Sequence, residues 1–210
     1  GLVGNAMGSY FQVPVIEGVT GTVPTSDDLK HFGAALASYG STAMFHIVGV
    51  TPAAPSLGAV FDGPPPAPAQ VSRADINAFI TSYAGDDDSL DVVVFAAPQL
   101  SIMELEKLAG LLKGQTLDSG VALIVATNPE NARAAERFGF AETIAASGAI
   151  LLEGVCFYNM HARELGEANG WTRLMTNSAK LTNIIGGYGY DPVLADMERC
   201  VESAVAGRIV

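Results

Sequence analysis

The sequence predicts a three-layer α/β/α domain with a mainly parallel sheet, joined to an irregular N-terminal segment. Three observations lead to this fold class. Short apolar runs alternate with helical segments between residues 91 and 153. These runs are continuously apolar, as is typical of parallel strands covered by helices on both faces. Hydrophobic residues make up 49% of the 210 positions and charged residues only 16%, a composition that favours a large buried core.

Residues 1–70 are expected to belong to a larger domain. The first 24 residues are rich in Gly, Val and Pro, and we expect them to be irregular. The elements expected here are a strand at 13–16, a helix from Ser26 to Tyr39 that ends at Gly40, a strand at 42–50 and a proline-rich surface loop at 51–69. Ser26 is expected to cap the helix, because Asp27 and Asp28 follow in its first turn.

A second domain is expected over residues 71–210. Its helices are expected at 72–83, 101–114, 129–139, 141–147, from Ser178 onward and at 192–206, and its strands at 91–96, 121–127, 149–153 and 172–175. Local signals mark several helix ends. Ser101 followed by Glu104 is a capping-box pattern, and Pro129 and Gly139 suit the first position and the end of a helix.

Parallel strands point the same way, so their carboxyl ends meet at one edge of the sheet, where α/β proteins bind ligands. We expect this edge to carry residues 46–51, 97–101, 127–128, 154–156 and 176–180. The turn at 96–99, Ala-Ala-Pro-Gln, holds no nucleophile, proton carrier or strong metal ligand. The most polar part of the edge is therefore the segment at 176–180.

This segment, Thr-Asn-Ser-Ala-Lys, places two hydroxyls, an amide and an ammonium at the start of a helix. Free N–H groups and a partial positive charge at a helix N-terminus suit a carboxylate or a phosphate. Lys180 is unfavourable in a first helical turn, which is a reason to look for a role. The alternative is that Ser178 or Asn177 only caps the helix and that Lys180 is solvated.

The cysteines and histidines give weaker indications. Cys156 follows a buried strand and is either a small buried side chain or, as a thiolate, a ligand for zinc or iron. No second cysteine accompanies it at close spacing. Cys200 is expected to face the core from the C-terminal helix. His46 is expected to be a hydrogen-bonded core residue and His161 a surface residue.

Charge and composition exclude some classes of protein. The net charge of −11, with sparse and unclustered Lys and Arg, argues against a nucleic-acid partner. No apolar run approaches the ~20 residues of a membrane span, and the N-terminal residues do not resemble a signal peptide. Two distant cysteines without a secretory signal favour a reducing, cytoplasmic setting.

Several stretches together resemble the C-terminal half of the aconitase X large subunit. The matching stretches, in family order, are VPVIEGV (13–19), LKHFGAALASYG (29–40), MFHIVGVTPAAPSL (44–57), VVVFAAPQLSIMELEKLAGLLKG (92–114), TNSAKL (176–181) and MERCVESAVAGRI (197–209). The resemblance implies an aconitase-like α/β/α fold and a dehydratase that acts on a small hydroxy acid through an iron or iron–sulfur centre. Family members act on cis-3-hydroxy-L-proline or on phosphomevalonate.

The sequence departs from the family pattern at three positions. Many relatives carry a cysteine where Ala97 stands, a histidine where Gln99 stands and a glutamate where Ala53 stands. The resemblance makes that missing cysteine an expected iron ligand and places a second family cysteine at Cys156. A methyl group cannot coordinate iron, so the centre implied by the resemblance is incomplete here.

By analogy with aconitase, the resemblance implies Ser178 as the base that removes the proton next to the substrate carboxylate. Lys180 would hold that carboxylate, Thr176 and Asn177 would shape the pocket, and Cys156 would be the remaining metal ligand. Gln99 and Ser101 are further candidates for substrate contact.

Two readings stay open. One is a dehydratase, with cis-3-hydroxy-L-proline favoured because no basic cluster for a phosphate accompanies the site. The other is a non-catalytic paralogue that acts in binding or assembly. In either case the resemblance implies partners, namely the missing N-terminal half and a small subunit or domain.

Overall fold

The computed structural model describes residues 1–19, 21 and 23–210, and the chain divides into two compact units, Gly1–Phe79 and Ile80–Val210. Each unit is described by itself. The predicted domains, 1–70 and 71–210, stay a prediction. The irregular conformation predicted for the first 24 residues lies outside the described residues at positions 20 and 22.

The first unit is mainly helical. Its elements are α1 (Leu2–Met7), β1 (Val15–Ile16), α2 (Ser26–Gly40), β2 (His46–Ile47), the 3-10 helix η1 (Leu57–Ala59) and α3 (Arg73–Thr81), which crosses into the second unit. β1 and β2 pair in parallel as a separate two-stranded sheet. The long strand predicted at 42–50 is therefore wrong, and residues 46–51 do not extend the larger sheet.

Two further corrections concern helix ends in this unit. Leu2–Met7 is helical where we predicted irregular chain, and Gly4 explains why local signals missed it. A Cβ on Gly4 would lie 2.9 Å from the Tyr39 Cβ and 3.0 Å from the Gly40 nitrogen, so α1 packs closely on α2. The cap of α2 is Thr25 rather than Ser26, because the Thr25 hydroxyl accepts the Asp28 N–H at 3.1 Å in a capping box.

The second unit contains the predicted α/β/α domain. Its helices and strands are β3 (Val92–Leu100), α4 (Ile102–Leu112), β4 (Ala122–Thr127), α5 (Pro129–Phe138), α6 (Phe140–Ala146), β5 (Ile150–Glu153), η2 (Phe157–Asn159), α7 (Ala162–Asn169), β6 (Arg173–Thr176), α8 (Ala179–Ile185), η3 (Gly186–Tyr188), β7 (Asp191–Leu194) and α9 (Met197–Ala206). The five strands are parallel in the order β5-β4-β3-β6-β7. The mainly parallel α/β class is confirmed.

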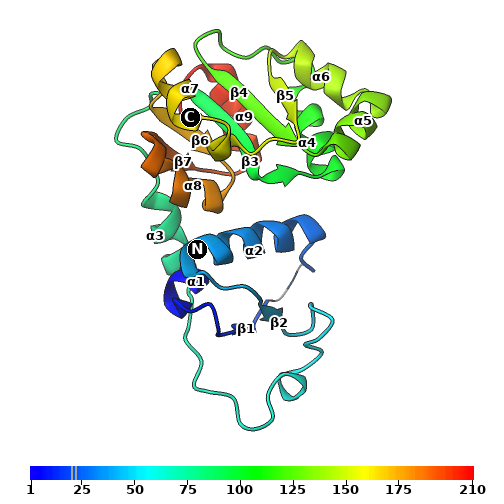
Figure 1. Cartoon of the computed structure of the whole chain (residues 1–210), viewed down its shortest axis with the longest axis vertical. Coiled ribbons are helices and arrows are strands. Elements are labelled where there is room, and N and C mark those ends of the chain that lie inside the picture. Colours follow the sequence, from blue (N-terminus) through cyan, green and yellow to red (C-terminus); the bar gives the residue numbers. More distant parts are fainter. Residues whose placement is uncertain (20, 22) are drawn as a thin grey trace. The chain divides into compact units, whose positions relative to one another are not determined.

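Alternate residues of β3 build the two cores on either side of this sheet. Val93 and Phe95 belong to a core formed with α4, α5, α6 and α9. Val92 and Val94 belong to a second core that includes Phe157 of η2 and residues of α7 and α8. The sheet therefore lies between two layers of helices (Figure 1). This burial of both strand faces explains why the strands are continuously apolar.

Local helix signals are confirmed, whereas the start of the last helix is wrong. Ser101 and Glu104 form the capping box of α4, and α5 begins at Pro129 and ends at Gly139. We predicted a helix from Pro192, but Asp191–Leu194 is an edge strand paired with β6. Proline is tolerated on an edge strand because no N–H is needed there. The helix α9 begins after its cap, Asp196.

The segment predicted as a tight turn at 96–99 is part of β3. The strand continues to Leu100, which pairs with Thr127, and its register shifts between Phe95 and Leu100. Ala97 has a φ of 68° within this irregular stretch. A non-glycine residue at positive φ costs free energy and concentrates at ligand sites, so the end of β3 is a natural place to look for one.

The strand order defines where a ligand site is expected. The chain passes from β3 to β4 and β5 on one side, and then returns to place β6 on the other side of β3. α4 follows β3 on one face of the sheet, and α8 follows β6 on the opposite face. Open α/β sheets bind ligands at the carboxyl ends of the strands where the order reverses. Here that point lies between β3 and β6.

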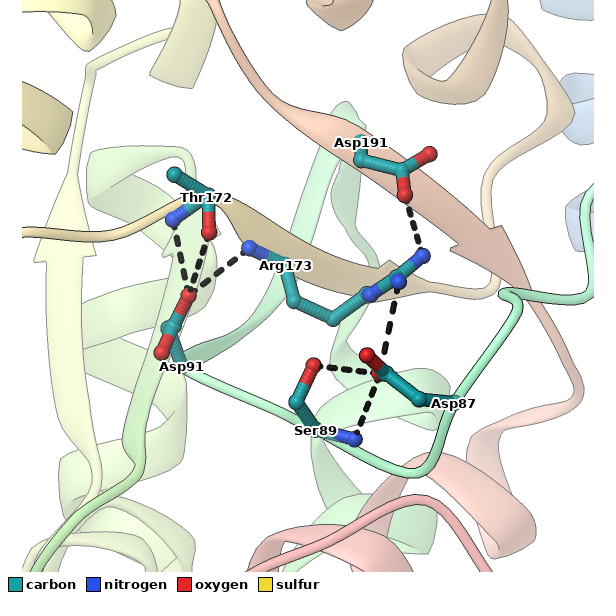
Figure 2. Close-up of polar contacts among 6 residues, drawn as sticks. All are labelled: Asp87, Ser89, Asp91, Thr172, Arg173 and Asp191. Atoms are coloured by element: carbon teal, nitrogen blue, oxygen red, sulfur yellow. Dashed lines mark hydrogen bonds and ion pairs between the residues drawn. The ribbon is translucent and has the colours of Figure 1, made fainter.

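The opposite, amino edge of the sheet carries a cluster of paired charges (Figure 2). Arg173 is 8% exposed, and its guanidinium donates to Asp191 and, at 3.4 Å, to Asp87. Asp91 accepts the backbone N–H groups of Thr172 and Arg173, both at 2.7 Å. The cluster joins the starts of β3, β6 and β7 and leaves its cation no charge to offer a ligand.

Candidate active site

Ser178 joins the two strand ends at the point where the strand order reverses. Its hydroxyl donates to the Ala97 carbonyl oxygen, and it accepts the Leu181 N–H at 3.1 Å. The residue is 1% exposed. The prediction that Ser178 caps α8 is confirmed. The base role stays a prediction, and it requires the hydroxyl to exchange the Ala97 carbonyl for substrate, since a carbonyl does not take up a proton at neutral pH.

Thr176 lies beneath Ser178 and is fully buried. Its hydroxyl donates to the Val94 carbonyl oxygen at 2.7 Å and accepts the Ser178 N–H at 3.2 Å. These contacts bind the end of β6 to the middle of β3. Thr176 thus shapes the floor of the site from within, and a direct contact between Thr176 and substrate stays a prediction.

Lys180 and Asn177 are the polar side chains of this edge that other described residues leave available. Both are partly exposed. Asn177 makes no side-chain hydrogen bond to a described residue, and no described carboxylate forms an ion pair with Lys180. The Lys180 Nζ lies 5.7 Å from the centre of the Tyr158 ring. Because α8 has only seven residues, the positive charge here belongs to Lys180 rather than to a helix end.

Gln99 and Ser101 are largely committed to the backbone. The Gln99 side-chain amide donates to the Val155 carbonyl oxygen at 2.7 Å, which ties the irregular end of β3 to the segment after β5. The Ser101 hydroxyl accepts the Glu104 N–H at 3.2 Å as the cap of α4. These contacts give both residues a structural role, and their contact with substrate stays a prediction.

Cys156 and Tyr158 follow the carboxyl end of β5. Cys156 is a partly buried free thiol that precedes η2. The pKa of Tyr158 is raised above its usual value, first by burial and then by a hydrogen bond to Cys156. Between them, Phe157 is fully buried and packs edge-on against Tyr190 at 5.9 Å. The buried phenylalanine anchors the short helix and so fixes its two neighbours.

The iron centre implied by the family resemblance can be tested against these side chains. In the part of the chain that the structure describes, no three His, Cys, Asp or Glu side chains gather to hold a metal ion. Ala97, where a cysteine was expected, presents a nearly buried methyl group. Iron–sulfur clusters are held by several thiolates, and Cys156 alone at this edge does not supply them. The described residues therefore do not fit such a cluster.

The other cysteine and the histidines lie apart from this edge. Cys200 is fully buried in α9, as predicted, and burial raises the pKa of its thiol. His161 is exposed, as predicted. His46 was predicted to be hydrogen-bonded, but its buried Nδ1 has no partner among the described residues. It belongs to the first unit, whose sheet is separate.

Comparison with known proteins identifies the family. Residues 90–206 match the model of the aconitase X third domain, and residues 1–81 match that of the aconitase X second domain. The chain belongs to the aconitase X family. This confirms the resemblance drawn from the sequence stretches, including VVVFAAPQLSIMELEKLAGLLKG and TNSAKL.

Named relatives of this aconitase X chain are dehydratases. It is 35% identical over 200 residues to a cis-3-hydroxy-L-proline dehydratase from Pseudomonas aeruginosa, covering 94% of this chain and 34% of the relative. It is 30% identical to the phosphomevalonate dehydratase large subunit of Methanothermobacter thermautotrophicus, covering 82% of this chain and 41% of that subunit. The chain thus spans well under half the length of these relatives.

A solved structure shows the same fold. The holo form of aconitase X from Thermococcus kodakaraensis superposes with a TM-score of 0.77 over 96% of this chain and 49% of that chain, at 22% identity. At this identity the likeness supports the fold alone. Among the described residues, no helix has the length and apolar content that crossing a membrane requires.

Tyr158 is the site residue that sequence reasoning missed. The list of strand ends stopped at Cys156, two positions earlier. A signal was present, because an aromatic residue directly after a strand end on the ligand edge is well placed to contact that edge. What the sequence did not contain was the partner: Lys180 reaches the ring only through the return of the chain to β6.

Proposed function

We propose that this aconitase X chain is part of a hydro-lyase that removes water from a small hydroxy acid at the carboxyl ends of β3 and β6. The observation that carries the proposal is the pair Lys180 and Asn177, an ammonium and an amide without hydrogen-bonded or ionic partners among the described residues. They stand where the strand order reverses. A carboxylate is the ligand that such a pair suits, since it accepts from both donors.

The proposed substrate is cis-3-hydroxy-L-proline. Relatives at 35% and 31% identity carry that name. The described part of the edge offers one unpaired cation, Lys180, which matches one carboxylate, whereas a phosphate in addition would call for further basic side chains. Elimination removes the proton on the carbon that bears the carboxylate and the hydroxyl on the next carbon, so that a carbon–carbon double bond and water form.

Each edge residue has a proposed part in this reaction. Lys180 and Asn177 hold the carboxylate, and Thr176 fixes the strand end beneath them. Ser178 is the proposed base. The Leu181 N–H already donates to its oxygen and would stabilise negative charge there, whereas its present hydrogen bond to Ala97 must be replaced by substrate. Gln99 and Ser101 line the approach from β3.

The proposal passes no step through iron, because the described side chains do not fit an iron–sulfur cluster. This same observation favours a second candidate, a ligand-depleted paralogue that binds or assembles without catalysis. Ala97, Gln99 and Ala53 replace side chains that could coordinate metal. The two candidates differ in turnover: the first requires release of water from the hydroxy acid, and the second requires none.

We further propose that the chain works together with more polypeptide. Named relatives include the large subunit of a phosphomevalonate dehydratase. Large apolar side chains are exposed within the first 24 residues, and such patches mark interfaces. These side chains are Tyr10, Phe11, Val13, Val19 and Val23. A cytoplasmic location belongs to the same proposal, since both cysteines are free thiols, which suits a reducing compartment.

The test is turnover of cis-3-hydroxy-L-proline by the complete enzyme that contains this chain. Lys180→Met keeps the length of the side chain and removes its charge. We expect this variant to raise the KM at least ~10-fold, because a charge-assisted hydrogen bond contributes about 1.5–3 kcal/mol. Lys113→Met, which removes a lysine from the residue that follows α4, is the matched control and should leave the KM unchanged. No product with any hydroxy acid would establish the paralogue instead.

A further inference from the structure

The Lys180 ammonium is held over an aromatic ring. Its Nζ lies 5.7 Å from the centre of the Tyr158 ring, within the ~6 Å at which a cation is attracted to the face of a ring. A lysine side chain is long and flexible, and an unrestrained ammonium would spread over many positions. The ring therefore supplies what the described carboxylates do not, a fixed place for the positive charge.

The ring itself is fixed from several sides. Tyr158 packs against the core that covers one face of the sheet, and its ring lies 6.4 Å from that of Tyr188. Phe157, its neighbour in η2, is fully buried. The Gln99 amide holds the preceding segment through the Val155 carbonyl oxygen. Packing, ring contact and hydrogen bonding all restrain the surface on which Lys180 rests.

We propose that Tyr158 is a positioning residue that sets the affinity of the site for a substrate carboxylate by holding the Lys180 ammonium over its ring. This inference rests on the proposed function, in which Lys180 binds that carboxylate. With one side of the ammonium covered by the ring, its remaining N–H donors face a smaller solid angle. Such an arrangement favours a single carboxylate over a larger, more highly charged phosphate.

The face of the ring, not the hydroxyl, carries this role. The hydroxyl is hydrogen-bonded to Cys156, away from the ammonium contact. Tyr158→Phe and Tyr158→Trp should therefore preserve the positioning, whereas Tyr158→Leu should abolish it. Tyr188→Leu is a matched control, because it removes an aromatic ring packed on the same core and leaves the Lys180 contact in place.

The first measurement tests the contact on this chain without any activity. In an NMR spectrum of the chain, the ring should shift the side-chain protons of Lys180 upfield, with Lys30, Lys107 and Lys113 as references. The shift should persist in Tyr158→Phe and disappear in Tyr158→Leu. A Lys180 signal that is unaffected by Tyr158→Leu would overturn the positioning role whatever the enzyme does.

The second measurement is calorimetric binding of L-proline, a carboxylate probe without the leaving hydroxyl, to the complete enzyme. We expect Tyr158→Leu to weaken binding ~2- to 5-fold, as the loss of one exposed cation–π contact predicts. The phenylalanine, tryptophan and Tyr188→Leu variants should bind within about 2-fold of the parent. In the Lys180→Met background, Tyr158→Leu should have no further effect, because the ring acts through the ammonium.

The outcomes separate this inference from the proposed function. If Lys180→Met weakens proline binding and Tyr158→Leu does not, the inference is overturned and the carboxylate site stands. If Lys180→Met has no effect on binding, the carboxylate site and the role of Tyr158 in it are both overturned, even where the NMR contact persists. An equal loss for Tyr158→Leu and Tyr188→Leu would assign the effect to packing and also overturn the inference.

Discussion

The two edges of the five-stranded sheet use charge in opposite ways. At the amino edge, Arg173 is buried and bound by Asp87 and Asp191 (Figure 2). At the carboxyl edge, Lys180 has only an aromatic ring beside it among the described residues, and Asn177 has no side-chain hydrogen bond. Paired charges cross-link strand starts and add stability, whereas unpaired ones remain available to a ligand. The contrast assigns structure to one edge and binding to the other.

The largest expected effect follows from Ser178, which belongs to both categories. Ser178→Ala should lower the turnover of the complete enzyme by ~10²–10⁴-fold with the KM roughly kept, because a general base contributes in the transition state. It should also cost about 1 kcal/mol of stability through the lost helix cap. Turnover and melting temperature should be measured on the same preparation.

Asp196→Ala is the control for the cap, since Asp196 caps α9 by accepting the Arg199 N–H at 2.8 Å. It should cost a similar stability and leave turnover intact. If Ser178→Ala melts lower and keeps near-normal turnover, Ser178 is only a cap, and the contrast between the edges then depends on Lys180 and Asn177 alone.

Sequence reasoning reached those features that neighbouring residues decide. The Ser101–Glu104 capping box and the ends of α5 at Pro129 and Gly139 are local, and they are confirmed. The strand at Asp191–Leu194 was missed because its conformation depends on pairing with β6, a tertiary contact. Local propensity is only a weak prior against such contacts.

The candidate site shows the same limit. The strand ends could be listed from the rule for parallel sheets, and that list included Ser178 and Lys180. Which ends adjoin depends on the strand order, which places β6 beside β3. The contact of Lys180 with Tyr158 and the bond from Ser178 to Ala97 follow from that order, so the sequence alone did not predict them.

The second prediction breaks the amino edge. Arg173→Met replaces the guanidinium with an apolar side chain of similar length and should cost about 1.5 kcal/mol of unfolding free energy, the lower end for charged hydrogen bonds. The lower end applies because the Asp87 and Asp191 side chains are 63% and 66% exposed and will be solvated. Denaturant unfolding gives the loss, and proline binding should not change.

Gly85→Ala tests the same cluster from the backbone, because an added methyl group would collide with the Arg173 guanidinium. Gly110→Ala is its control, since a methyl group there meets no atom within 4 Å. The comparison of edges fails if Arg173→Met weakens ligand binding as much as Lys180→Met does.

The third prediction concerns the two thiols, one near the carboxyl edge and one in the core. Burial raises the pKa of Cys200, so the folded state keeps its proton where the unfolded state loses it. The stability from this group is complete below the usual thiol pKa of about 8.5 and falls as pH rises above it, by at most ~1.4 kcal/mol per pH unit. Unfolding measured from pH 8 to 10 should show this decline.

Cys200→Ala should flatten that decline, although it lowers stability at neutral pH by leaving a small cavity. Cys156→Ala, at the partly exposed thiol, is the matched control and should leave the slope unchanged. Parallel slopes for all three proteins would show that Cys200 does not govern the alkaline loss.

The smallest expected effect concerns Asp87 at the rim of the amino edge. The pKa of Asp87 is lowered first by its hydrogen bond from the Ser89 hydroxyl, at 2.6 Å, then by the Ser89 N–H, and less by Arg173. A lowered carboxyl pKa contributes stability above the unfolded value of about 3.9, and that stability is lost as pH falls through the folded pKa. Ser89→Ala should therefore raise the pKa of Asp87 more than Arg173→Met does. An NMR titration of the carboxyl carbon measures both shifts. If Arg173→Met gives the larger shift, the ion pair rather than the local turn holds Asp87 charged, and the amino edge depends on its buried cation more than these contacts indicate.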